Sequence, residues 1–108
     1  MLLRGSHDLA RLAGDHGWGG HTFVLGGAVD GGRIHGTYPA AFGADSPLQI
    51  DNMALPTTSL ESLWHGLAQW FGVEDEAMEQ VLPNIKNFQD CSAGPGCGVL
   101  TKEMMFEA

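Results

Sequence analysis

Basic residues are scarce in this sequence of 108 residues, where 5 Lys and Arg stand against 13 Asp and Glu and the formal net charge is -8 at pH 7. Nucleic-acid backbones and anionic membrane surfaces are bound by clustered positive charge. The charge balance therefore argues against nucleic acid and against a membrane surface as partners. It is compatible with the binding of cations.

Long apolar runs are also missing. No stretch approaches the ~20 consecutive apolar residues that a membrane-spanning helix needs. Residues 1–7 contain no apolar core of a signal peptide. We therefore expect neither a membrane span nor a signal peptide in the chain, and its localisation stays open.

Cysteine is limited to Cys91 and Cys97, near the C-terminus. Two thiols alone are too few for a structural zinc site. A local disulfide and a reduced pair are both compatible with this spacing. Neither cysteine has a His or a basic residue close by in the sequence to activate it, which argues against a nucleophilic thiol.

What the sequence does contain suits one small folded domain, since 44% of the residues are hydrophobic and 17% are charged. We predict a single domain over residues 1–108, with a tail containing Gly and Cys over residues 89–108. Nine of the 16 glycines fall between Gly14 and Gly36, where backbone geometry outweighs side-chain packing. Residues 22–25 and 33–38 are typical of two short strands, separated by a turn at 30–32.

One amphipathic helix dominates the second half of the chain. Thr58 and Glu61 form the pattern of a capping box, and Gly72 is placed to end the helix. A second short helix is predicted over residues 76–82, before Pro83. The apolar stripe of the main helix consists of Leu60, Leu63, Trp64, Leu67, Ala68 and Phe71.

This stripe is wider than a lone strand pair could cover. Burying each large side chain would contribute ~1.5–3 kcal/mol, so we expect the stripe to pack against a larger sheet. The fold class that we predict is α/β, as one edge of a layered structure. The competing interpretation is a small interaction module, whose exposed face of Trp64, Trp70 and Phe71 docks on a partner.

A carboxylate and two imidazoles fall within seven residues of one another, in a glycine-rich segment. Asp15, His16 and His21 offer oxygen and nitrogen donors that suit divalent ions. The alternative is that Asp15 and His16 form a turn or capping pair, and that His21 is a hydrogen-bonded residue beside a strand. We expect His35 to face solvent and His65 to be structural or exposed.

The order of motifs resembles a known family. Residues 15–29 (DHGWGGHTFVLGGAV) and 31–36 look like the C-terminal part of the bacterial family known as domain of unknown function 1501, in the alkaline-phosphatase-like and sulfatase-like superfamily. The resemblance covers about residues 14–88. The later segments that resemble the family, in the same order, are 55–59, 70–73, 81–84 and 87–88.

The resemblance implies that the chain is part of an alkaline-phosphatase-like α/β/α sandwich. Members are several times longer, and many are exported by the twin-arginine route. Superfamily enzymes hydrolyse phosphate or sulfate esters with a Ser, Thr or modified Cys nucleophile beside two divalent metals held by Asp and His. Asp15 and His16 are then the most ligand-like positions, with His21 as a weaker third, for Zn, Mn or Ca.

The chain lacks the nucleophile region and the Ser-Glu-Phe-Gly segment that many family members carry upstream. We therefore expect a C-terminal module that is not catalytic alone and keeps part of a metal site. The alternative is a metal-dependent ester hydrolase, completed by a missing N-terminal portion or by a partner chain.

Overall fold

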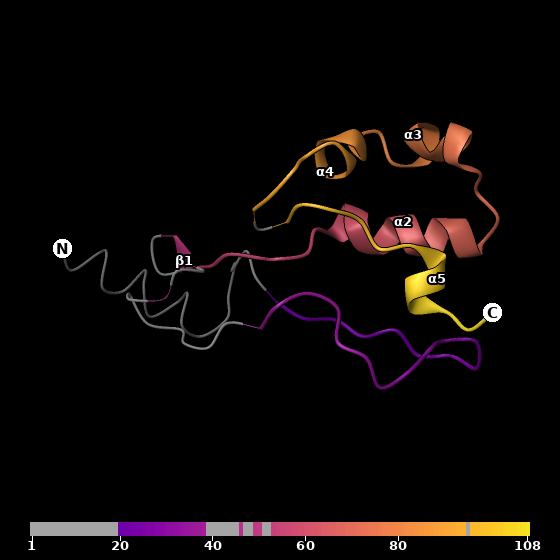
Figure 1. Ribbon diagram of the computed structural model, residues 1–108, viewed down its shortest axis with the longest axis horizontal. Helices are drawn as coiled ribbons and strands as arrows, with labels where there is room; N and C mark the ends of the chain where they lie inside the picture. The colour runs from indigo at the N-terminus through magenta and orange to yellow at the C-terminus, as the bar shows by residue number, and fades with distance from the viewer. Residues whose placement is uncertain (1–19, 39–45, 47–48, 51–52, 95) are drawn as a thin grey trace. The chain divides into compact units, whose positions relative to one another are not determined.

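The computed structural model describes residues 20–38, 46, 49–50, 53–94 and 96–108 (Figure 1). It divides into two compact units: unit 1 comprises Met1–Thr22 and Tyr38–Pro56, and unit 2 comprises Phe23–Thr37 and Thr57–Ala108. The elements are β1 (Gln49–Ile50) and β2 (Met53–Ala54) in unit 1, and α2 (Leu60–Trp70), the 3-10 helix η1 (Asp75–Ala77), α3 (Met78–Val81), α4 (Lys86–Gln89) and α5 (Lys102–Met105) in unit 2.

The prediction of an α/β fold is wrong, because the part of the chain that the structure describes is mostly helical. Its paired strands are β1 and β2, of two residues each, which pair antiparallel. Neither residues 22–25 nor residues 33–38 form a strand, and the described chain shows no layered sandwich.

The predicted strands fail because, apart from Val24, most of their apolar side chains meet no core. The exposed fractions are 79% for Phe23, 84% for Leu25 and 89% for Ile34. The segment between them pairs instead with the C-terminal end: Asp30 N donates to Met105 O at 2.9 Å, and Glu107 N donates to Ala28 O at 2.9 Å. A contact between distant parts of the sequence has replaced the predicted local strand pair.

Helix α2 lies where the sequence predicts the main helix, but its cap differs. Ser59, not Thr58, is the N-cap residue, and its hydroxyl accepts from Ser62 N at 3.0 Å. Gly72 follows the helix with φ 98°, a conformation that favours glycine and ends the helix as expected. The predicted helix over residues 76–82 is divided into η1 and α3.

Besides Met78 and Ile85, the buried apolar side chains of unit 2 come from residues 89–108, which were predicted to be a tail. Leu100, Met105 and Phe106 are buried together, where α5 lies beside α2 (Figure 1). The ring of Phe106 also stacks on Trp70, with the ring centroids 4.9 Å apart. The partly buried side chains that pack on this cluster are Val24, Val29, Leu63 and Leu67.

Cys91 and Cys97 form a disulfide, which decides between the two states that the sequence left open. The loop that it closes is also held by hydrogen bonds on both sides. Gly96 N donates to Thr57 O at 3.0 Å, and Gly98 N donates to Phe88 O at 2.8 Å. The disulfide therefore fixes the path of the chain from α4 toward Leu100 and the core.

Residues 36–37 are tied to the residues just before α2. Thr37 N donates to Thr57 Oγ1 at 2.9 Å, and the same hydroxyl donates to Thr37 O at 3.0 Å. Gly36 has φ 92°, and a Cβ added there would collide with Thr58 Oγ1. Two of the segments that carry the family resemblance thus meet in unit 2.

Gly36→Ala should lower the free energy of unfolding by about 1–2 kcal/mol, because an L side chain is strained at this φ and has no room beside Thr58. Urea unfolding followed by circular dichroism measures the change. The matched control is Gly31→Ala, at a position with open space and no left-handed φ. Equal stability of the two variants would contradict the contact between Gly36 and Thr58.

Cys91→Ser/Cys97→Ser should lower the free energy of unfolding by about 2 kcal/mol, the loop-closure entropy of a short loop. Thermal unfolding with and without dithiothreitol supplies the control. Reductant should lower the Tm of the wild-type chain and leave that of the double variant unchanged. A wild-type Tm that does not respond to full reduction would mean that the bond contributes nothing to stability.

Candidate functional site

The predicted metal ligands are only partly described by the structure. Asp15 and His16 lie outside the described residues. His21 is exposed, and its ring lies 6.2 Å from the ring of Tyr38, centroid to centroid. Among the described residues, no three His, Cys, Asp or Glu side chains gather closely enough to hold a metal ion. The metal site therefore stays a prediction.

The most unusual feature of the described chain is the orientation of α2. The residues of this helix that are buried are Ser62, His65 and Gly66, which lie outside the predicted apolar stripe. Trp64 is 51% exposed and Phe71 is 78% exposed. The helix therefore turns its small and polar residues toward the core of unit 2, and much of its apolar stripe away from it.

Hydrogen bonds explain why this polar face is buried. Ser62 Oγ accepts from Leu100 N at 2.9 Å, and His65 Nδ1 donates to Leu100 O at 2.7 Å. His65 Nε2 is then left as an acceptor, and the side-chain amide of Gln89 lies 3.4 Å from it. A buried backbone group without a hydrogen-bond partner is destabilising. Ser62 and His65 supply these partners to the backbone of Leu100. His65 is thus structural and buried, one of the two outcomes expected for it.

Gln69 extends the same face by one turn. Its Oε1 accepts from Lys102 N at 3.0 Å, at the start of α5, and its Nε2 donates to Asp75 Oδ1 at 3.1 Å. Gly66 lets the C-terminal segment come close, since a Cβ there would collide with Met105 Sδ of α5 and lie 3.3 Å from Leu100 O. The C-terminal segment therefore packs on the polar face of α2.

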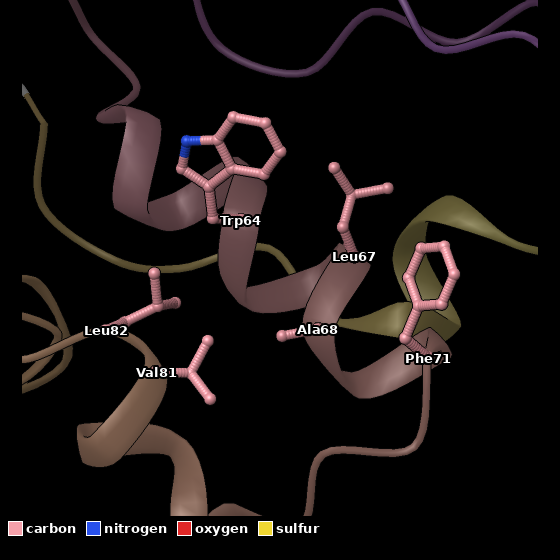
Figure 2. Close-up of a pocket in the computed structure, with 6 residues that line it drawn as sticks. All are labelled: Trp64, Leu67, Ala68, Phe71, Val81 and Leu82. Atoms are coloured by element: carbon pink, nitrogen blue, oxygen red, sulfur yellow. The ribbon is translucent and has the colours of Figure 1, made fainter.

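The opposite side of α2 borders an apolar groove. Its cavity volume is about 380 Å³. Figure 2 shows Trp64, Leu67 and Phe71 projecting from α2, while Val81 and Leu82 approach the helix from the end of α3. The groove is lined by Trp64, Leu67, Ala68, Phe71, Val81 and Leu82. An open apolar surface of this kind is typical of a protein contact.

The stretch of chain that supplies the groove walls contains acidic residues but no basic ones. Between Leu60 and Ile85 the sequence contains no Lys or Arg. The next basic residue, Lys86, pairs with Glu79 at 2.7 Å, and this hydrogen bond and charge raise the pKa of Lys86. The acidic residues of this stretch are Glu61, Glu74, Asp75, Glu76 and Glu79.

The sequence predicts the α2 side of this groove but not the α3 side. The spacing of apolar residues predicts the stripe of α2. Val81 and Leu82 line the groove only because the chain folds back and brings the end of α3 close to α2. The adjacent apolar pair before Pro83 is the one signal that could have pointed to them. The hydroxyl-bearing segment Thr57–Ser59 serves the structure: Thr57 binds Thr37, and Ser59 caps α2.

Comparison with known proteins gives no match to a protein-family model, to a curated protein or to a solved structure. The family resemblance therefore rests on the motifs alone. No helix in the described part of the chain is long and apolar enough to cross a membrane.

Proposed function

We propose that this chain is a non-catalytic docking module, the C-terminal part of a protein of the domain of unknown function 1501 family. Its role is to complete that protein by packing the apolar face of α2 and α3 against the remainder. The order of motifs over residues 14–88 supports the family. The observation that carries the docking role is the orientation of α2, which leaves Trp64 and Phe71 exposed at 51% and 78%.

Full burial of one large apolar side chain contributes ~1.5–3 kcal/mol, so covering the remaining exposed area of Trp64 and Phe71 would stabilise a complex substantially. The polar face of α2 is already occupied by the C-terminal segment, so rotation of the helix could not bury the stripe without breaking the bonds to Leu100. A second surface is required to cover it.

Among the described residues, both cysteines and two of the hydroxyl groups have structural roles, which fits the proposal of a chain that is not catalytic alone. Cys91 and Cys97 are joined to each other, so neither is a free thiolate. Thr57 Oγ1 is bound to the backbone of Thr37, and Ser59 Oγ is the cap of α2. Hydrolysis of p-nitrophenyl phosphate or sulfate by the purified chain alone would contradict this part of the proposal.

A divalent-metal site is the second part of the proposal. Asp15, His16 and His21 would hold Zn, Mn or Ca, since one carboxylate and two imidazoles form a donor set that suits such ions. In the completed protein, a metal at this position would polarise an ester oxygen. That is the hydrolase function that the resemblance implies for the whole protein.

The docking role predicts binding to a family protein that has been truncated before its own C-terminal part. Trp64→Ser/Phe71→Ser should weaken this binding by at least about tenfold, because large buried aromatics dominate interface energies. Surface plasmon resonance measures the Kd. The matched control is Phe23→Ser, since Phe23 is 79% exposed and Phe71 is 78% exposed. Equal losses at both sites, or no binding by the wild-type chain, would contradict the docking role.

The metal site predicts uptake of one Zn or Mn ion by the chain under native mass spectrometry. Asp15→Ala/His16→Ala should lower this uptake by about a hundredfold or more, since a single remaining imidazole cannot retain the ion. His35→Ala serves as the control, because His35 is an exposed histidine outside the predicted ligand set. Uptake that is the same in the double variant and the wild type would remove the site.

A further inference from the structure

The charges around the apolar groove specify what can occupy it. We infer that the groove between α2 and α3 binds a cationic amphipathic helix, with apolar side chains on one face and Lys or Arg beside them. This inference rests on the proposed function, in that it gives the chemistry of the segment that covers the docking face. It adds a charge requirement that the docking role alone does not contain.

The shape of the groove favours a helix. Helix α2 has 11 residues, which corresponds to a length of about 16 Å at 1.5 Å per residue. The groove wall on this helix is built from side chains one helical turn apart, at Trp64, Leu67 or Ala68, and Phe71. A partner helix of about three turns, with apolar residues at i, i+3 or i+4, and i+7, presents anchors at the same intervals.

The acidic residues near the groove favour Lys or Arg beside the apolar side chains of the partner helix. Glu61 lies one turn before Trp64 on α2, and Glu76 follows Phe71 in the sequence on η1, whereas Asp75 of η1 is bonded to Gln69. Glu79 on α3 already has Lys86 as its partner, and residues 60–85 themselves contain no Lys or Arg. Lys or Arg on the incoming helix would complement the acids at both ends of the α2 stripe and would speed association.

The same charges disfavour the other occupants of an apolar groove. A second copy of this chain would bring its own acidic stretch against the first, and like charges that face each other weaken association. Each copy also carries a net charge of -8. An anionic membrane surface is disfavoured for the same reason. A cationic amphipathic helix can make apolar contacts with the groove wall and also pair with the acidic residues at its ends.

A pair of synthetic peptides tests this directly with the full, disulfide-bonded chain. Both are fluorescent 14-residue helices of Leu and Ala with the same apolar stripe; one carries Lys and the other Glu at the flanking positions. Fluorescence anisotropy in low salt should give a Kd for the Lys peptide at least tenfold lower than for the Glu peptide. Equal affinities would overturn the inference.

Two pairs of variants separate the groove from general attraction between opposite charges. Trp64→Ser/Phe71→Ser should abolish binding of the Lys peptide, whereas Phe23→Ser should retain it. Glu61→Gln/Glu76→Gln should weaken binding by about threefold or more. Glu103→Gln/Glu107→Gln, which changes the net charge equally, should leave it unchanged. Equal weakening by both charge variants, or full binding by the Trp64→Ser/Phe71→Ser chain, would overturn the inference.

The outcomes also distinguish this inference from the proposed function. If the Lys peptide binds in the groove but the truncated family protein does not, the proposed docking role fails and the charge requirement stands. If the family protein binds equally well to the wild type and to Glu61→Gln/Glu76→Gln, at low and at high salt, the docking role stands and the charge requirement is wrong.

Discussion

The structure of unit 2 depends on two hydrogen bonds between α2 and the backbone of Leu100. Ser62 accepts from the amide of this residue, and His65 donates to its carbonyl, so a single buried peptide segment is satisfied by one face of the helix. Once those bonds form, the rotation of α2 about its own axis is fixed. The apolar stripe is then directed only partly at the core: Leu63 and Leu67 pack on it, while Trp64 and Phe71 do not.

The C-terminal segment consequently supplies the buried cluster beside α2 and also orients this helix. Leu100 is placed by the hydrogen bonds from α2, and Met105 and Phe106 then fill the space beside it. The disulfide between Cys91 and Cys97 restricts the unfolded chain just before this position. A segment whose glycines and short length suggest a loose end is therefore the part of the chain around which unit 2 is organised.

The sequence predicted those features that depend on neighbouring residues. The helix at α2 and its end at Gly72 follow from spacing and glycine, and only the cap moved, from Thr58 to Ser59. The strand at residues 22–25 was predicted from a short β-branched and apolar run, and the strand at 33–38 from alternation. Either pattern produces a strand only where apolar side chains are buried. Here Ala28 and Asp30 found partners at the distant residues Glu107 and Met105. A pattern among neighbouring residues cannot reveal a contact between residues that lie so far apart in the sequence.

The candidate site shows the same division between local pattern and tertiary contact. The hydrophobic spacing of α2 identifies the side chains that form the groove wall, yet it also predicts that they face inward, which is the usual arrangement for an amphipathic helix. The burial of His65 and Ser62, with Trp64 and Phe71 left exposed, shows that the stripe faces the core only in part. Because α2 contacts the core of unit 2 through polar side chains, part of its apolar stripe remains exposed and can bind another surface. The acidic stretch around that stripe then limits which surface this can be, because a neutral or acidic partner would gain the apolar contact but leave the carboxylates without complement.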